Sequence, residues 1–424
     1  MRLLIKNIKK LVQVEDRALS PRRGSEMAVL NCLDNAFLLC ENGIISDYGA
    51  MEELYGPNIK YNSLASLELS CDQVVDAQGK MVLPAWCDSH THLVYAGSRE
   101  VEFIDKIRGL SYQEISRRGG GILNSVKLLH DTSEDDLFDQ TMVRVDEIIR
   151  FGTGAVEIKS GYGLSLEDEL KMLRVIKRIS EQSPLQVKAT FLGAHAVPRR
   201  YIGDRDGYVN EIINEMIPIV SSEGLAEFID VFCEDGFFSV EDSDRILNAG
   251  MKYGLIPTVH ANQMSISGGV QVGVKYGAIS VAHLEYTGKR EFEALKDSDT
   301  IATLLPGSTF FLEMEYAPAR EMLAEGLPLA LATNYNPGSS PSGDIKFMMS
   351  LACLKMKMTP EEAINAATLN GAHAMNLGDE LGSITRGKRA NLIITKEIPT
   401  YDYLLYAFNS PLIDKTILNG KIYG

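Results

Sequence analysis

Long hydrophobic runs are missing from this 424-residue sequence, and no stretch approaches the ~20 uncharged apolar residues that a membrane-spanning helix needs. The opening MRLLIKNIKKLVQVEDR has no apolar core followed by a small-residue cleavage site, so we expect no signal peptide. The six cysteines include no C-x-x-C pair. This pattern argues against a zinc ribbon or a disulfide framework and is typical of reduced cysteines in a cytoplasmic protein.

Basic residues are also too few to balance the acidic ones, because 42 Lys and Arg stand against 57 Asp and Glu, a net charge of −15. Nucleic acids and anionic membranes attract basic patches, so we expect neither as a partner. A small anionic substrate remains compatible with this charge. One local Arg can outweigh a distant field that salt screens within roughly 10 Å.

The sequence does contain a repeated alternation of short apolar runs and helical patterns. The clearest helical pattern covers 165–179, where Ser165 and Asp168 resemble a capping box and apolar residues follow at helical spacing. Apolar runs joined by helices indicate parallel strands that are buried on both faces. Eight such units within about 250 residues match a closed (β/α)8 barrel, the TIM barrel, better than an open sheet. The eight runs are 83–92, 154–161, 187–196, 228–235, 255–262, 279–285, 300–307 and 327–334.

The two ends of the chain differ from this middle part. Both contain short alternating runs with turn signals, and the tail includes Asn419-Gly420, a strong hairpin signal. Each flank alone would make a domain of marginal size. We therefore predict an α/β protein of two domains: a (β/α)8 barrel of residues 83–383, and one small β-sandwich that residues 1–82 and 384–424 build together.

Five of the seven histidines fall at the carboxyl ends of predicted barrel strands, where barrel enzymes build their active sites. A single histidine is more often structural than a ligand, but structural histidines have no reason to gather on one rim. The five are His90 and His92 on the first strand, His195 on the third, His260 on the fifth and His283 on the sixth. His130, in LLHDTSEDD, and His373, inside a helical pattern, lie elsewhere and are interpreted as structural.

His90 and His92 are two residues apart in a strand, so both side chains enter the mouth of the barrel. Neutral imidazole binds Zn²⁺ or Fe²⁺, and a third His with an oxygen ligand leaves one coordination position open. A His-x-His pair alone is a weak signal, because chance alternation produces it. Here His260 lies on the same predicted rim, and a metal ion bound there would lower the pKa of a water molecule from about 15.7 to roughly 7.

The loops beyond the strands offer groups for an anionic substrate. Arg99 follows the first strand, and its guanidinium can bind a carboxylate through two hydrogen bonds. Tyr112 and Tyr162 lie on the loops after the first and second strands, the latter between two flexible glycines. Gly119-Gly120-Gly121 either lets backbone approach a ligand or forms an ordinary loop. The NPGSS segment at 336–340 offers N–H groups and hydroxyls to an anion, although a bare turn fits the spacing nearly as well.

These motifs, with several others, resemble those of the imidazolonepropionase family in the amidohydrolase superfamily. The likeness covers nearly the whole chain, and several of its motifs are far more specific than the His-x-His pair. They are DSHTHLVYAGSRE, SYQEI, RRGGGI, VEIKSGYGL, FLGAHAVP, DVFCEDGFF, VHANQ, SGGVQVG, HLEYTG, LLPGS and NPGSSPSG. The resemblance implies hydrolysis of the ring C–N bond of 4-imidazolone-5-propanoate to N-formimidoyl-L-glutamate, a step of histidine degradation.

The resemblance also implies roles for individual residues. One divalent or ferric metal ion, Zn or Fe, would be bound by His90, His92, His260 and the residue at the fourth-ligand position, Asn334. Contacts with the substrate, its propanoate or the glutamate part of the product would come from Arg99, Tyr162, His195, Gln263, Asn336, Gly338 and Ser339, with Tyr112 nearby. His283 is not needed as a ligand and is placed to move protons. The expected catalytic residues are therefore His283, Gln263 and Asn334.

Two positions depart from the family pattern. Asn334 stands where the family has Asp, which is both a metal ligand and the proton acceptor from the attacking water. Ala282 precedes His283 where the family usually has Asp, whereas Gln263 departs less because the family carries Glu or Gln there. An amide oxygen coordinates weakly and is not a base. We therefore expect metal binding weakened by at least ~10–100-fold and a rate loss on the order of 10²–10⁴, unless His283 acts as the base.

Two alternatives remain open on the sequence alone. One is a different cyclic amidohydrolase or a deaminase on the same barrel, and the loop motifs argue against it. The other is a catalytically silent protein that binds imidazolone-propanoate or formimidoyl-glutamate, which only Asn334 and Ala282 favour. Three histidines and an oxygen suit Zn²⁺ and Fe²⁺ almost equally. A homodimer is the expected assembly, because it is the commonest one for such enzymes.

Overall fold

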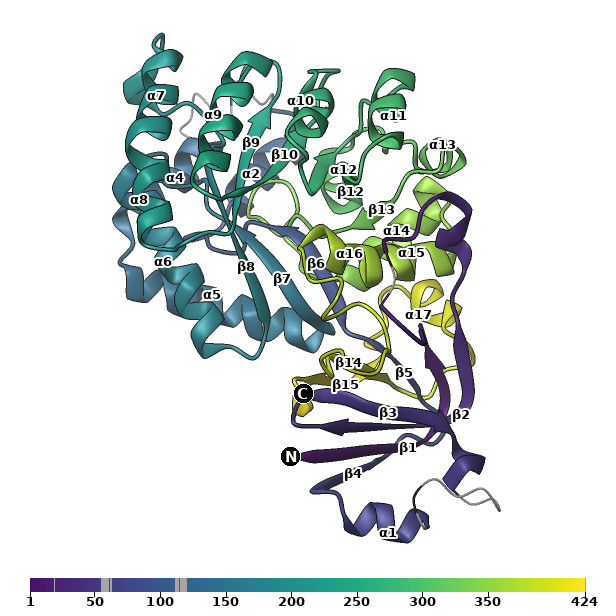
Figure 1. The fold of residues 1–424 in the computed structure, drawn as a ribbon. Coiled ribbons are helices and arrows are strands. Elements are labelled where there is room, and N and C mark those ends of the chain that lie inside the picture. Colours follow the sequence, from purple (N-terminus) through teal and green to yellow (C-terminus); the bar gives the residue numbers. More distant parts are fainter. Residues whose placement is uncertain (19, 55–60, 62, 111–113, 115–119, 424) are drawn as a thin grey trace.

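The computed structural model describes the chain except residues 19, 55–60, 62, 111–113, 115–119 and 424. Two parts are visible: a barrel of alternating strands and helices, and a smaller sheet that contains both chain ends (Figure 1). Among the described helices, none is both long and apolar enough to cross a membrane.

Eight parallel strands form the barrel, each hydrogen-bonded to the next along the chain. They are β6 (Trp86–Thr91), β7 (Thr153–Lys159), β8 (Gln186–Ala194), β9 (Phe228–Cys233), β10 (Ile256–Ala261), β11 (Ser280–His283), β12 (Ile301–Leu304) and β13 (Leu329–Leu331). The ring closes where the segment after β13 meets the end of β6, because Asn334 N–H donates to His90 O (2.9 Å) and His92 N–H donates to Tyr335 O (3.0 Å). The predicted (β/α)8 barrel is confirmed, and all eight predicted runs overlap a barrel strand.

The first predicted run, 83–92, is divided between two sheets. Its first residues belong to β5 (Met81–Pro84), which pairs with strands of the smaller sheet, and only Trp86–Thr91 enters the barrel as β6. An uninterrupted apolar run therefore does not mark the boundary between two buried strands, since both are equally apolar.

The barrel helices cover the outside of the strands and lie between consecutive strands along the chain (Figure 1). In α6, Ser165 Oγ accepts the Asp168 N–H, and Leu170, Leu173 and Ile176 are buried against the barrel, so the predicted helix is confirmed. The helices are α2 (Glu100–Ile107), α4 (Ile122–Asp131), α5 (Glu134–Arg150), α6 (Leu166–Gln182), α7 (Arg205–Glu211), α8 (Ile217–Ser222), α9 (Val240–Lys252), α10 (Gly269–Lys275), α11 (Lys289–Lys296), α12 (Pro306–Leu312), α13 (Ala319–Ala324), α14 (Ile345–Met356), α15 (Pro360–Ala367) and α16 (Leu369–Ala374).

The smaller sheet draws strands from both ends of the chain, in the order β16-β15-β14-β5-β1-β2-β3, with β4 pairing β1. Its strands are β1 (Arg2–Val12), β2 (Cys32–Glu41), β3 (Ile44–Ala50), β4 (Gln73–Asp76), β5, β14 (Leu392–Thr395), β15 (Ile413–Leu418) and β16 (Lys421–Tyr423). Helices α1 (Leu64–Leu69) and α17 (Asp402–Tyr406) lie in the same flanks. The hairpin signal is correct: β15 and β16 are antiparallel, and Asn419 and Gly420 between them have φ of 50° and 74°.

The strands of this sheet bury a core that is separate from the barrel core. Residues from β1, β2, β3, β5, β14 and β15 share one apolar cluster, so both ends of the chain contribute to one core on a single mixed sheet. Part of the first flank, however, packs on the barrel. The Arg22 N–H donates to Asn370 Oδ1, and Asn365 Nδ2 donates to Met27 O within the short helix η1 (Gly24–Ala28).

Candidate active site

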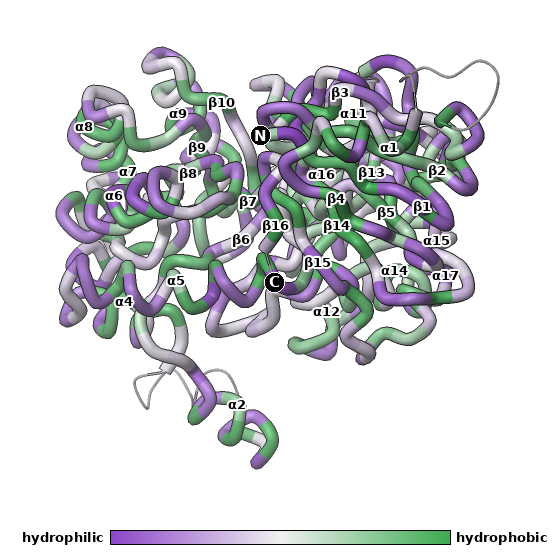
Figure 2. The backbone as a smooth tube through the Cα atoms, turned by 90° about the horizontal axis from the view of Figure 1, so that it is seen from below, coloured by the Kyte–Doolittle hydropathy of each residue, from purple (hydrophilic) through white to green (hydrophobic). Residues whose placement is uncertain are grey.

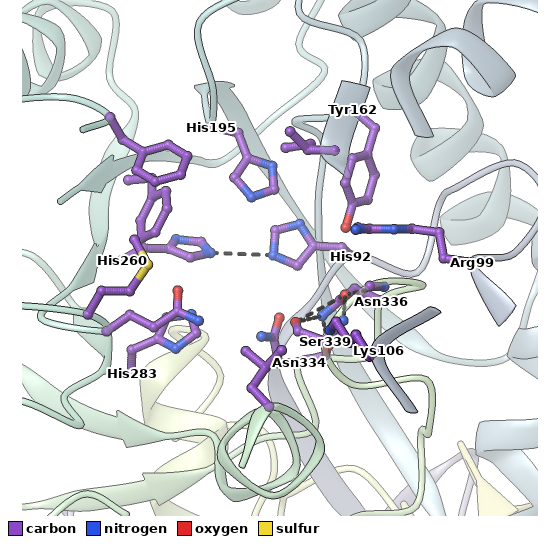
Figure 3. Close-up of a pocket in the computed structure, with 17 residues that line it drawn as sticks. His92, Arg99, Lys106, Tyr162, His195, His260, His283, Asn334, Asn336 and Ser339 are labelled. Carbon is purple, nitrogen blue, oxygen red and sulfur yellow. Dashed lines mark hydrogen bonds between the residues drawn. The ribbon is translucent and has the colours of Figure 1, made fainter. Parts of the chain in front are cut away.

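The five rim histidines converge in the mouth of the barrel, and Figure 3 shows four of them: His92, His195, His260 and His283. His90 and His92 leave β6, His260 leaves β10 and His283 ends β11, and all four are buried. The ring centroids of His90 and His260 are 4.4 Å apart, those of His260 and His283 are 5.5 Å apart, and His92 stacks on His195 at 5.0 Å. The structure thus brings together every histidine that the sequence placed on this rim.

The nitrogen atoms of these histidines are spaced for a metal ion. The ligand atoms of His90, His260 and His283 lie within 4.8 Å of one another, and His92 Nε2 lies 3.3 Å from His260 Nε2. Two nitrogens on one tetrahedral ion, each at ~2.0–2.1 Å, would lie about 3.3 Å apart. His90 Nε2 and Asn334 Oδ1 are buried without a hydrogen-bond partner among the described residues. An unsatisfied buried polar atom costs ~1–3 kcal/mol, so the site fits a bound cation.

The imidazoles of His90, His92, His195 and His260 are held neutral. Burial lowers the pKa of His90 and His92 well below the ordinary histidine value, and neighbouring charges, including the Lys159 ammonium and other rim histidines, lower it further. Burial also lowers the pKa of His260 to about 4, although Asp230 opposes it, and that of His195 to about 3. A neutral ring has a free lone pair, which metal binding requires.

A buried charge network under His260 was not anticipated from the sequence. Asp230 Oδ1 accepts from His260 Nδ1 (3.0 Å) and from the His260 backbone N–H (3.1 Å). Lys159 Nζ donates to Asp230 Oδ2 (2.8 Å) and to Glu157 Oε1 (2.7 Å), and Thr258 Oγ1 also donates to Asp230 Oδ2 (2.8 Å). Because a carboxylate only accepts, His260 carries its proton on Nδ1, and Nε2 is left free for a metal.

The charges in this network stabilise each other. Burial would raise the pKa of Asp230, but His260 and Lys159 hold it well below its ordinary value. Burial raises the pKa of Glu157 to about 6 despite its contact with Lys159. Glu157 and Lys159 are two residues apart in a strand, so the sequence alone indicates that their side chains share one face. Nothing in it indicates that Asp230, two strands away, completes the cluster.

Asn334 lies opposite the histidine pair, at the seam of the barrel. Its Nδ2 donates to Ser308 Oγ on α12 (2.8 Å), which turns Oδ1 toward the site, and its φ is 51°. Ala282 is buried in a small apolar cluster with Leu305 and Ala332. Its register partner on β10 is His260, so both departures from the family pattern face the barrel interior.

His283 has an acidic neighbour that the sequence reading missed. Its Nδ1 lies 3.5 Å from Glu285 Oε2, and that oxygen is buried and without a hydrogen-bond partner among the described residues. Glu285 Oε1 accepts from Thr309 Oγ1 (3.0 Å). His283 itself has a φ of 82°, rare for a residue with a side chain and typical of functional positions. Glu285 thus supplies a carboxylate near His283 although Ala282 does not.

A cavity of about 330 Å³ opens beside the histidines. Its lining contains Arg99, Lys106, Tyr162, His195, Gln263, Asn334, Asn336, Gly338 and Ser339 among others. Two of the described lining residues are cations, Arg99 and Lys106, and none is a carboxylate. Tyr112, expected nearby, lies outside the described residues, as does Gly119. Apart from Tyr112, the structure brings all predicted substrate-contacting residues to this cavity.

The NPGSS segment is a tight turn in which the backbone N–H groups of Gly338 and Ser339 already donate to a side chain of the same turn. Asn336 Oδ1 accepts the N–H groups of Gly338 (2.8 Å) and Ser339 (2.8 Å), and Asn336 Nδ2 donates to Asn334 O (2.6 Å). An anion therefore finds no free N–H on these two residues. It can meet the Asn336 amide, the Ser339 hydroxyl and the cations opposite.

The loop that contains Tyr162 is held by hydrogen bonds to Glu169, although its two glycines were interpreted as flexible. Glu169 accepts the N–H groups of Gly161 (3.0 Å), Gly163 (2.8 Å) and Leu164 (2.8 Å). A Cβ on Gly163 would lie 2.4 Å from the Glu169 backbone nitrogen, so this glycine permits close packing. Gly161 O in turn contacts His195 Nδ1 (2.9 Å), which leaves His195 Nε2 as an acceptor facing the cavity.

Replacing Glu169 with Gln should disturb this loop. A Gln places an NH₂ group against the Gly161 N–H, which breaks one hydrogen bond and lowers the free energy of unfolding by ~1–3 kcal/mol. Because Gly161 orients His195, we expect KM for the substrate to rise more than kcat falls. Denaturant unfolding and steady-state kinetics measure both. Glu167→Gln, exposed on the same turn of α6, is the matched control, and equal behaviour of the two variants would contradict this role.

The two histidines set aside from the sequence are outside the site. His130 is exposed at the end of α4 and contacts Asp168 Oδ2 (2.8 Å). His373 lies on α16, away from the strands. Both therefore lie where the sequence placed them, away from the rim of the barrel.

Comparison with known proteins agrees with a hydrolase site at the mouth of this barrel. The amidohydrolase family profile matches residues 265–423. An imidazolonepropionase of Flavobacterium johnsoniae is 54% identical over 419 residues, 99% of this chain and 99% of that protein. One of Geobacillus sp. strain WCH70 is 41% identical over 420 residues, 99% of this chain and 97% of that protein.

Solved structures resemble the chain in fold. Guanine deaminase of E. coli superposes with a TM-score of 0.74 at 13% identity, covering 100% of this chain and 99% of that one. An adenosine deaminase of Xanthomonas campestris with bound zinc superposes with a TM-score of 0.67 at 16% identity, covering 99% and 92%. At such low identity the likeness concerns the barrel and its accompanying sheet, not the substrate.

Proposed function

The chain belongs to the imidazolonepropionase family of amidohydrolases, and from this we propose that its clustered histidines hold and serve one catalytic metal ion. As a member of this family it is a hydrolase of carbon–nitrogen bonds in cyclic amides. Its reaction opens the ring of 4-imidazolone-5-propanoate and yields N-formimidoyl-L-glutamate.

We assign His90, His92 and His260 as metal ligands, with Asn334 Oδ1 as the oxygen donor. The observation that supports this most directly is the set of buried atoms without partners, His90 Nε2 and Asn334 Oδ1, around the close pair of His92 and His260 Nε2 atoms. When bound, a Zn or Fe ion supplies Lewis acidity and lowers the pKa of a water molecule to roughly 7. Both metals stay in the proposal, as one divalent or ferric ion per chain.

The cavity lining suits an anionic ring substrate. Its positive groups favour a carboxylate, and the Asn336 amide and the Ser339 hydroxyl face the same end. His195 Nε2, a fixed acceptor, can take a hydrogen bond from a ring N–H. Tyr162 stays a neutral phenol, because burial raises its pKa, and can donate its O–H to a carbonyl. Gln263 offers an amide for the other ring edge.

His283 is assigned as the group that moves protons. Its Nδ1 faces Glu285 Oε2, a carboxylate that can pair with the ring when it holds two protons. Gln263 and Asn334 are amides and cannot accept a proton, so they orient the reactants. This division leaves the proton of the attacking water to His283.

Removing the metal is expected to abolish hydrolysis, and added Zn²⁺ or Fe²⁺ should restore it in proportion to the metal bound. His92→Ala should lose both metal and activity, whereas His130→Ala, exposed on α4, should keep both. Plasma mass spectrometry measures the metal and product formation measures the rate. Full turnover by chelated protein, or full metal content in His92→Ala, would contradict the assignment.

Asn334 also favours a second function, binding without turnover. Calorimetric binding of the substrate with no product over hours would support it, and measurable turnover excludes it.

We further propose a homodimer in the cytoplasm. The six free cysteines suit a reducing compartment, and light scattering measures the assembly.

A further inference from the structure

Arg99 and Lys106 both line the mouth of the cavity, but they differ in whether an acidic side chain binds them. Arg99 donates from Nε (2.9 Å) and Nη2 (2.5 Å) to Glu102 Oε2, and Glu102 Oε1 accepts the Gly121 N–H (2.9 Å). A Cβ on Gly338 would lie 2.1 Å from Arg99 Nη1, so the guanidinium lies close against the turn at Gly338. Arg99 is therefore held between Glu102 and the turn at Gly338, and Glu102 offsets part of its charge.

Lys106 differs from Arg99 in having no such partner. It lies in the last turn of α2, and no ion pair or hydrogen bond joins it to another residue of the described chain. Its Nζ lies 5.4 Å from the centroid of the Phe311 ring, which places the ammonium over the aromatic face. Burial, followed by repulsion from Arg99, lowers the pKa of Lys106, and the Glu102 carboxylate opposes this in part.

The position of Lys106 is fixed by packing across the mouth. Phe103 of α2 stacks on Phe311 of α12 at 5.7 Å, and Leu312 beside it lines the cavity. Helix α2 otherwise extends from the body of the molecule (Figure 2). In the close-up, Lys106 approaches the end of the cavity where Asn336 and Ser339 lie (Figure 3). The ammonium is thus brought from a peripheral helix to the end of the cavity opposite the histidines.

We propose that Lys106 contributes to the specificity of this site for anions, because its ammonium pairs with the carboxylate of the substrate. This inference rests on the proposed function of the cavity. Arg99 is paired with Glu102, while Lys106 supplies a positive charge that no ion pair of the described chain holds. A neutral ring of the same shape would leave the Lys106 ammonium partly buried and unpaired, so the site disfavours it.

The test compares Lys106→Met, which keeps the length of the side chain and removes the charge, with Lys106→Arg. We expect Lys106→Met to raise KM for 4-imidazolone-5-propanoate by ~10–100-fold, with kcat nearly unchanged, and Lys106→Arg to restore most of the affinity. Lys127→Met, the same change of charge on the exposed face of α4, should leave both constants unchanged.

Binding to the metal-free protein separates charge from shape. The probes are 3-(imidazol-4-yl)propanoate and its methyl ester, measured by calorimetry. Lys106→Met should weaken binding of the acid by the same ~10–100-fold and leave binding of the ester unchanged. Equal weakening of both probes, or none of either, overturns the role of Lys106. Failure of the wild type to bind the acid in either the metal-free or the metal-loaded form overturns the proposed function as well.

Discussion

Asn334→Asp is expected to raise kcat/KM by about 10²–10⁴ and metal affinity by ~10–100-fold. Asn334 Oδ1 is buried without a partner beside His90, so a carboxylate there gives the metal an anionic ligand and the attacking water a base. The substitution fits the local structure. Ser308 Oγ accepts from Asn334 Nδ2 and can donate to Asp instead, because a hydroxyl does both.

Kinetics with bound metal quantified in each sample measure this effect. The matched control is Asn376→Asp, which adds the same charge at another residue of positive φ (56°) that is exposed to solvent. Equal activity of the wild type and Asn334→Asp at equal metal content would mean that His283 alone is a sufficient base. Turnover only in Asn334→Asp would instead support the silent binding protein.

Lys159→Met is expected to lower the free energy of unfolding by about 3–5 kcal/mol, since it leaves buried carboxylates without their cation. Lys159 is almost fully buried and donates to both Glu157 and Asp230. Because Asp230 orients His260, metal affinity should fall by ~10–100-fold as well. Denaturant unfolding measures the first effect, and competition with a chromogenic chelator measures the second.

Two further variants separate the loss of charge balance from general damage. Adding Glu157→Gln to Lys159→Met removes one of the two carboxylates and should recover part of the stability, so the two substitutions are not additive. Lys388→Met removes another buried lysine, one that donates to the backbone carbonyls of Gly378 and Leu381. It should destabilise the fold and leave metal affinity unchanged. An equal fall of metal affinity in Lys388→Met would contradict a specific role of Lys159 in metal binding.

The sequence predicted the elements whose pattern is local. Apolar runs of the right length gave the barrel strands, and histidines at the ends of those runs gave the rim on which His90, His92 and His260 meet. Helix α6 could be predicted equally well, since its cap and its apolar face lie within one short segment. In each case the physical cause, a period of burial or a hydrogen bond to a near neighbour, acts within a few residues.

What the sequence could not predict depends on partners distant along the chain. Asp230 resembles any polar residue in a buried run until Lys159 and His260 are placed beside it. Arg99 was expected on a loop over the mouth, and nothing in the sequence indicated that Glu102, in the first turn of α2, would bind its guanidinium. The glycines around Tyr162 were interpreted as flexible. Only the packing of α6 reveals that they permit contact with Glu169.

The seam between β6 and the segment after β13 has a consequence for how the protein is made. His90 and His92 leave the ribosome long before Asn334, and the Asn334 N–H reaches His90 O only when the last strand closes the ring. Pairing of chain segments so distant is slow, and it follows the local folding of the early βα units. A growing chain therefore presents its first two histidines without their oxygen partner. The complete ligand set is a property of the finished barrel.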